Sequence, residues 1–98
     1  MAEAITGLLK SGNKAIATTG TAVALSTAKQ LVNGVLISAP AGNSGIIYVG
    51  DSNVTNTAGA SGNGYGLPAG KDLPLPMVDL SQVYINGTAG DYVTWVAI

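Results

Sequence analysis

The sequence predicts an all-β protein, an antiparallel β-sandwich or small jelly roll of about seven or eight short strands. Its apolar runs are short and β-branched, and Gly, Pro, Asn or Ser bounds each of them, as is typical of strands. No amphipathic pattern extends beyond about two turns of helix. The clearest runs are residues 35–37 and 46–49. The breaker-rich segment between them, residues 39–45, predicts that the chain reverses or crosses over there.

The chain divides into an N-terminal arm, residues 1–13, and one β-sandwich domain, residues 14–98. In the arm, Ile5, Leu8 and Leu9 have the spacing of one or two helical turns. An isolated helix of that length is marginal in water. The functional interpretation is a segment that becomes ordered against a neighbouring subunit, and the alternative is a frayed terminus.

The domain begins with two predicted short strands, residues 14–19 and 21–26, on either side of Gly20. Residues 27–33 fit either a turn of helix or another extended segment, and the sequence does not choose between them. Asn33-Gly34 is a turn dipeptide that leads the chain into the central apolar run.

Residues 50–66 form a long glycine-rich segment in which only Val54 and Tyr65 offer much apolar surface to bury. A connection of this length is unusual in a compact domain, and such loops tend to be functional or mobile. A plain mobile loop is one interpretation. The other is a binding loop, in which Tyr65 is the best candidate contact.

Two prolines predict an edge strand at residues 73–78. Leu73, Leu75 and Met77 alternate with Pro74 and Pro76, so the apolar side chains share one face of an extended segment. The two missing N–H groups lie along the same side of the strand, and that side cannot pair with a neighbour. Such an edge resists open-ended aggregation.

The C-terminal part predicts a strand at residues 83–85, a hairpin turn at residues 86–90 and a final strand at residues 92–98. Both faces of this last strand are fairly apolar, so we expect it to lie inside a sheet, or between the sheet and a partner. The predicted core consists of Val23, Leu25, Val35, Ile37, Ile47, Val49, Leu75, Val83, Ile85, Val93 and Trp95.

Composition argues against several classes of function. Charged residues make up 9% of the chain, against about 25% in an average soluble domain. The net charge is −1, and no basic cluster is present to bind a phosphate backbone, so we expect no nucleic-acid partner. Neither a membrane span nor a signal peptide is expected. The charge-poor surface suits a chain that packs against others.

The sequence predicts no enzyme, because it contains no His and no Cys, and we expect no cofactor. The acids Asp51, Asp72, Asp79 and Asp91 all lie beside turns, where an aspartate usually caps local backbone groups. A calcium site built from Asp51 and Asn53 is chemically feasible, but no EF-hand-like spacing supports it. We therefore predict no catalytic residue and no metal ligand.

Four runs are informative when they are taken together in their order: GVLI at residues 34–37, GIIYVGDSNVT at 45–55, YGLPAG at 65–70 and DLSQVYI at 79–85. In this order they resemble small virion structural proteins of tailed bacteriophages. The resemblance extends over residues 20–98 and leaves out the arm. It implies a β-sandwich module in a phage particle, such as a capsid decoration (cement) protein, a head-fibre base or a tail component.

We therefore expect a capsid decoration protein that binds the major capsid protein and stabilises the assembled head. Its expected location is the virion, assembled in the host cytoplasm. The expected partner contacts are Ile5, Leu8, Leu9 and Tyr65. Self-association as a homotrimer is also expected, since icosahedral shells offer threefold sites. The alternative is a tail or fibre component that recognises host-surface glycans through Tyr65 and its loop.

Overall fold

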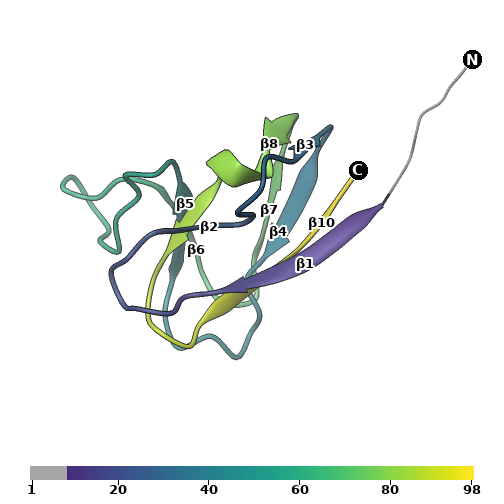
Figure 1. Ribbon diagram of the computed structural model, residues 1–98. Helices are drawn as coiled ribbons and strands as arrows, with labels where there is room; N and C mark the ends of the chain where they lie inside the picture. The colour runs from purple at the N-terminus through teal and green to yellow at the C-terminus, as the bar shows by residue number, and fades with distance from the viewer. Residues whose placement is uncertain (1–8) are drawn as a thin grey trace, which may run out of the picture.

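The structure is a computed structural model that describes residues 9–98 of the chain. Its larger antiparallel sheet, here called sheet A, has the strand order β1-β10-β4-β7 (Figure 1). The purple strand β1 and the yellow strand β10 lie side by side, which joins the two ends of the domain. The strands of sheet A are β1 (Lys10–Ala15), β10 (Tyr92–Ala97), β4 (Val35–Ser38) and β7 (Asp72–Leu75).

A second antiparallel sheet, sheet B, has the order β2-β9-β5-β6, and a third sheet pairs two very short strands. The strands of sheet B are β2 (Val23–Ala24), β9 (Tyr84–Asn86), β5 (Ile47–Gly50) and β6 (Tyr65–Leu67). The third sheet joins β3 (Leu31–Val32) to β8 (Val78–Asp79), and a short 3-10 helix, η1 (Leu80–Gln82), follows. The predicted all-β antiparallel sandwich is confirmed, and β3 shows that residues 27–33 are partly extended.

The core contains the inward side chains of these strands. All predicted core residues are buried except Val23, Leu75 and Trp95, which are half-buried and pack against the core. Trp95 is therefore less buried than expected, although its indole packs over Gly12 of the edge strand β1. The buried core is Ile16, Leu25, Val32, Val35, Ile37, Ala39, Ile47, Val49, Leu67, Leu80, Val83, Ile85, Val93 and Ala97.

Two predictions about sheet position are confirmed. Strand β10 lies inside sheet A between β1 and β4, and strand β7 is an edge that pairs only with β4. The predicted range 73–78 is too long, because β7 ends at Leu75, Met77 is exposed and Val78 lies in β8 of the third sheet. The opposite edge, β1, carries Lys10 and Lys14 on the face that Ala97 and Val93 share, which is the inner face. Inward-pointing charges of this kind disfavour the addition of a further strand to an edge.

The start of the domain differs from the prediction. Strand β1 begins at Lys10, inside the range assigned to the arm, and residues 16–19 do not continue it. The physical reason is that Gly12 lies opposite Trp95, where a Cβ atom would come within 2.8 Å of the indole Cζ2. Gly12, near the predicted end of the arm, is thus the residue that lets β1 pair with β10.

The two turn-rich connections both carry the chain between sheets. Residues 39–45 lead from β4 in sheet A to β5 in sheet B, as a predicted crossover would. The hairpin predicted at residues 86–90 is wrong, because β9 lies in sheet B and β10 in sheet A. The cause is Asn86, whose side chain is buried and bonded to distant backbone groups, so that it does not form a hairpin turn.

The segment at residues 50–66 is folded against the domain at its start and its end. Val54 is buried, and its carbonyl accepts a hydrogen bond from the Asn86 side chain. The backbone N–H of Thr55 donates to the Asn63 carbonyl at 2.8 Å, and the Asn63 N–H donates back to the Thr55 hydroxyl at 2.8 Å. Tyr65, expected in the loop, is instead the first residue of β6.

We expect Gly64→Ala to lower the free energy of unfolding by about 1–3 kcal/mol, the usual cost of a strained backbone position. Gly64 has φ 126°, and an added Cβ would lie 2.4 Å from the Val54 Cγ2 atom. Gly42→Ala is the matched control, since that position has no neighbour within 4 Å. Urea denaturation of both variants checks this, and equal stability would contradict the packing of Val54 against Gly64.

Candidate functional site

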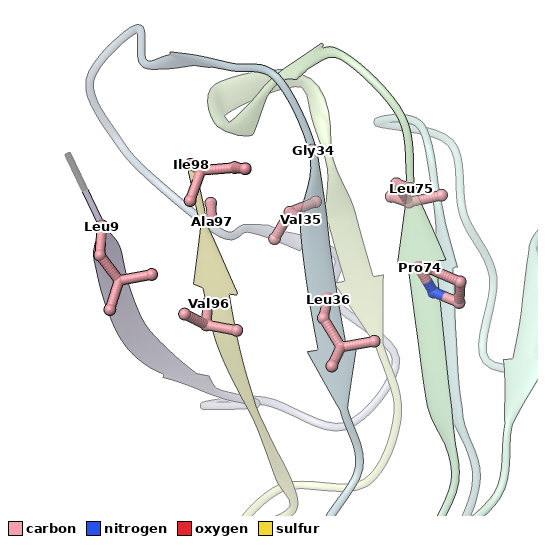
Figure 2. Close-up of a pocket in the computed structure, with 9 residues that line it drawn as sticks. All are labelled: Leu9, Gly34, Val35, Leu36, Pro74, Leu75, Val96, Ala97 and Ile98. Atoms are coloured by element: carbon pink, nitrogen blue, oxygen red, sulfur yellow. The ribbon is translucent and has the colours of Figure 1, made fainter. Parts of the chain in front are cut away.

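The outer face of sheet A presents a row of apolar side chains that nothing in the described chain covers. Register places Val96 beside Leu36, and Leu36 beside Pro74, across three neighbouring strands. Leu9 and Ile98 lie at the end of the same face, 70% and 55% exposed (Figure 2). We call the hollow between these five side chains the outer-face groove.

The outer-face groove has a volume of about 320 Å³. Its floor comes from Gly34, Val35, Leu75 and Ala97, so it extends from Leu9, which precedes β1, across β10 and β4 to Pro74 of β7 (Figure 2). A smaller hollow of about 160 Å³ continues along the same face between Leu36 and Thr94. The apolar surface therefore continues along the outer face of sheet A beyond the groove itself.

Charge is nearly absent from this face. Among the strand residues that register places on the outer side of sheet A, Asp72 alone is charged, and it accepts a hydrogen bond from the Ser38 hydroxyl at 2.7 Å. The lysines of β1 lie on the inner side. An apolar face with so little charge has few groups that keep another protein surface away, and contiguous exposed apolar surface commonly marks an interaction site.

The candidate partner contacts do not form one site. Leu9 lies in the outer-face groove at the β1 edge of sheet A. Ile5 and Leu8 fall outside the described residues. Tyr65 borders a different hollow, which opens between the sheets beside the β7 edge. Of the predicted contacts, Leu9 therefore belongs to the outer-face groove and Tyr65 to a second, separate surface.

The hollow beside Tyr65, here called the edge groove, has a volume of about 410 Å³. Its lining is largely apolar, and the exposed ring of Tyr65 stands at its border, with 59% of the residue accessible. Asp51 and Gln82 add the polar groups. An exposed aromatic ring beside a carboxylate and an amide is the combination that a sugar contact needs, so this groove carries the alternative function.

Three of the four turn aspartates cap backbone groups, as predicted. Asp91 is buried and accepts hydrogen bonds from the backbone N–H groups of Ser44 at 2.8 Å and Gly45 at 2.9 Å. Asp79 accepts from the N–H groups of Gln30 and Ser81, both at 3.0 Å. Asp91 thereby holds the 39–45 crossover, and Asp79 holds the segment that leads into β3.

The same bonds lower the pKa of both carboxyls. The Ser44 N–H is the main cause of the lowered pKa of Asp91, and the effect exceeds the opposing cost of burial. For Asp79 the main cause of the lowered pKa is the Gln30 N–H, followed by that of Ser81. Both groups therefore favour the folded state in their ionised form.

We expect the protein to lose stability as the pH falls below about 4, where an unfolded aspartate takes up a proton. A carboxyl whose pKa is lowered on folding stabilises the protein above its unfolded pKa, and this contribution disappears as the pH falls through the folded pKa. Asp91→Asn should therefore be less stable than the natural chain at pH 7, and the difference should shrink towards pH 3.

Thermal unfolding followed at several pH values measures this, with Asp72→Asn as the control. Asp72 is exposed and accepts one hydrogen bond, from the Ser38 hydroxyl, so its replacement should change the stability little. A stability difference for Asp91→Asn that stays constant from pH 7 to pH 3 would contradict the proposed role of the carboxylate.

The calcium hypothesis gains no support from the geometry around Asp51. Its Oδ1 accepts hydrogen bonds from the Asn53 backbone N–H at 2.9 Å and from the Asn63 amide at 3.4 Å. Within residues 9–98 no three His, Cys, Asp or Glu side chains gather closely enough to hold a metal ion. In the same part of the chain, no helix has the length and apolar character to cross a membrane.

Comparisons with known proteins give no family, relative or fold neighbour. No family model matches the sequence, and no curated protein and no solved structure matches the chain. Functional inference therefore rests on the surfaces described above and on the sequence resemblance.

Sequence reasoning missed Leu36 and Pro74 as members of a binding surface. Leu36 carried a signal, because it alternates with the buried Val35 and Ile37 and so must point outward from its strand. Pro74 carried none, since its contact with Leu36 depends on the pairing of β4 with β7.

Proposed function

We propose that this protein is a virion structural subunit of a tailed phage, a capsid decoration protein that binds the major capsid protein and stabilises the assembled head. The observation that supports this most is the uncovered, nearly uncharged outer face of sheet A with its groove. A face of this kind favours attachment to a large protein surface over conversion of a small substrate. The sequence resemblance adds the phage particle as the place of action.

Self-association as a homotrimer belongs to the same proposal. The outer face leaves exposed apolar side chains that closed symmetry would cover without forming open filaments. We propose three copies because icosahedral shells offer threefold sites and because the sequence resembles phage virion proteins. We propose no catalytic role for the protein.

A tail or fibre component that recognises host-surface glycans is the second candidate. The specific observation in its favour is the edge groove, with the exposed Tyr65 beside Asp51 and Gln82. Glycan-array binding that Tyr65→Ala abolishes would support it. The control is Tyr92→Ala, which removes another exposed ring, on the outer face of sheet A, that does not line the edge groove.

The decoration proposal is tested by separating heads from tails of the phage that encodes this chain and identifying their proteins by mass spectrometry. We expect the protein in the head fraction, and heads without it should release DNA at a lower temperature. Readdition of the purified protein should restore the higher temperature. Detection of the protein in tails alone would overturn the proposal.

A further inference from the structure

We propose that Asn33-Gly34 is a site of spontaneous covalent modification, at which the Asn33 side-chain amide is converted to a carboxylate through a cyclic imide. This inference goes beyond the proposed function, because it concerns the chemistry of the chain itself and does not depend on what the protein binds. The sequence contains three Asn-Gly pairs, at residues 33–34, 63–64 and 86–87, and they lie in different surroundings.

The reaction consumes only water. The backbone nitrogen of the glycine loses its proton to the solvent and attacks the asparagine Cγ atom, so that an N–Cγ bond forms, the Cγ–Nδ2 bond breaks and ammonia leaves. Water then opens the resulting succinimide ring at either carbonyl group, which gives aspartate or isoaspartate. Glycine favours the first step because it has no Cβ atom to hinder the attack.

The Asn33-Gly34 pair is open to this attack. Asn33 is exposed and lies in the bend between β3 and β4, outside the strand ladders. Among residues 9–98, neither the Asn33 side-chain amide nor the Gly34 N–H has a hydrogen-bond partner. A Cβ atom added at Gly34 would meet only the Leu75 carbonyl oxygen, at 3.4 Å. Gly34 therefore has room to turn its nitrogen towards the Asn33 side chain.

The Asn86-Gly87 pair is closed to it. Asn86 is buried at the end of β9, where its Nδ2 donates to the carbonyls of Gly20 and Val54 at 3.2 and 3.0 Å. The nitrogen that would attack, that of Gly87, donates its hydrogen to the Asn86 Oδ1 at 2.8 Å. Attack on Cγ would require these bonds to break inside the core.

The Asn63-Gly64 pair is exposed but held in place. The Asn63 Nδ2 donates to the Asn53 carbonyl at 3.2 Å and to the Asp51 Oδ1 at 3.4 Å. Gly64 has φ 126° and leaves no space for a Cβ atom beside Val54, so its backbone is fixed by packing. This pair should react only when the segment around it opens.

Isoaspartate at position 33 would disturb one defined place in sheet A. The Asn33 N–H donates to the Ile98 backbone oxygen at 2.6 Å, and the Ile98 N–H donates to the Gly34 carbonyl at 3.2 Å. In isoaspartate the main chain runs through the Cβ and Cγ atoms, which inserts a CH₂ group between these two bonds and disturbs the register of β4 with the end of β10. The new carboxylate also places a charge next to Gly34, which lines the outer-face groove.

Ageing of the purified full-length chain in mildly alkaline buffer tests the proposal, because base removes the glycine proton before the attack. Samples are digested at intervals, and tandem mass spectrometry locates each newly formed acid. The same incubation in concentrated urea is the control, since all three pairs are then unfolded. Gly34→Ala is the matched variant, because its Cβ hinders the attack at a position without positive φ and with room for the methyl group. Circular dichroism confirms that the variant is folded.

We expect the folded chain to form acid at position 33, part of it isoaspartate, and to form acid at positions 63 and 86 at least about tenfold more slowly, because those pairs need local opening. In urea the three rates should become similar, and Gly34→Ala should suppress the reaction at position 33. A folded chain in which Asn33 does not react, or reacts no faster than Asn63 or Asn86, would overturn the proposal. Aspartate without isoaspartate, or an unchanged rate in folded Gly34→Ala, would also overturn it, since neither fits a cyclic imide.

Discussion

Replacement of Ile37 by alanine is expected to lower the free energy of unfolding by about 2–5 kcal/mol, the usual cost of a large cavity in a core. Ile37 is fully buried in β4, where it pairs with Trp95 on one side and Leu73 on the other. Domains of this kind have only about 5–15 kcal/mol of stability in total, so the loss would be severe.

Urea denaturation at low protein concentration measures the effect, and Leu36→Ala is the matched control. Leu36 is the preceding residue of β4, but its side chain points to the outer face and is 40% exposed. It should lose far less stability than Ile37→Ala in the dissociated protein. Similar losses for the two variants would contradict the assignment of β4's inner and outer faces.

Asn86→Ala is expected to cost as much as the loss of a core side chain, although the residue is polar. Asn86 is buried, and its Nδ2 donates to the carbonyls of Gly20 at 3.2 Å and Val54 at 3.0 Å. Its Oδ1 accepts from the Gly87 N–H at 2.8 Å. Each buried backbone group left without a partner costs about 1–3 kcal/mol, and the Val54 carbonyl and the Gly87 N–H lose theirs together, whereas Gly20 is exposed.

The control for this variant is Asn53→Ala. Asn53 and Asn86 each begin an Asn-x-Thr triplet, so the two substitutions change the same residue type in a similar local sequence. Asn53 is exposed, and its backbone makes the hydrogen bonds that hold the segment, so truncation of its side chain should be nearly neutral. Denaturant unfolding gives both values. Faster amide exchange at Gly87 in Asn86→Ala would confirm the loss of that bond, whereas equal costs for the two asparagines would contradict the central role of Asn86.

Local sequence patterns were sufficient to predict several parts of this fold. The alternation in residues 92–98 predicted an internal strand with two apolar faces, because side chains of a strand point alternately to either side. The two prolines around Leu75 predicted an edge, since a residue without an N–H group cannot pair on that side. Both features depend on neighbours within a few residues, and both are confirmed.

The features that sequence could not predict depend on contacts between distant residues. Gly12 suggests the end of a segment until the position of Trp95 is known, more than 80 residues later. Asn86 suggests a turn until its contacts with Gly20 and Val54 are seen. The outer-face groove likewise needs the order of four strands, which no local pattern contains.

The central claim is that the outer face of sheet A is a contact surface between copies, and sedimentation equilibrium tests it most directly. The full chain is compared with Val96→Lys, which places a charge in the outer-face groove, and with Met77→Lys, an equally drastic change at an exposed residue outside it. Far-UV circular dichroism confirms that each variant is folded. We predict that the full chain and Met77→Lys self-associate in the micromolar range, while Val96→Lys stays monomeric. A full chain that remains monomeric at high micromolar concentration, or a Val96→Lys variant that associates as strongly as the natural chain, would contradict the claim.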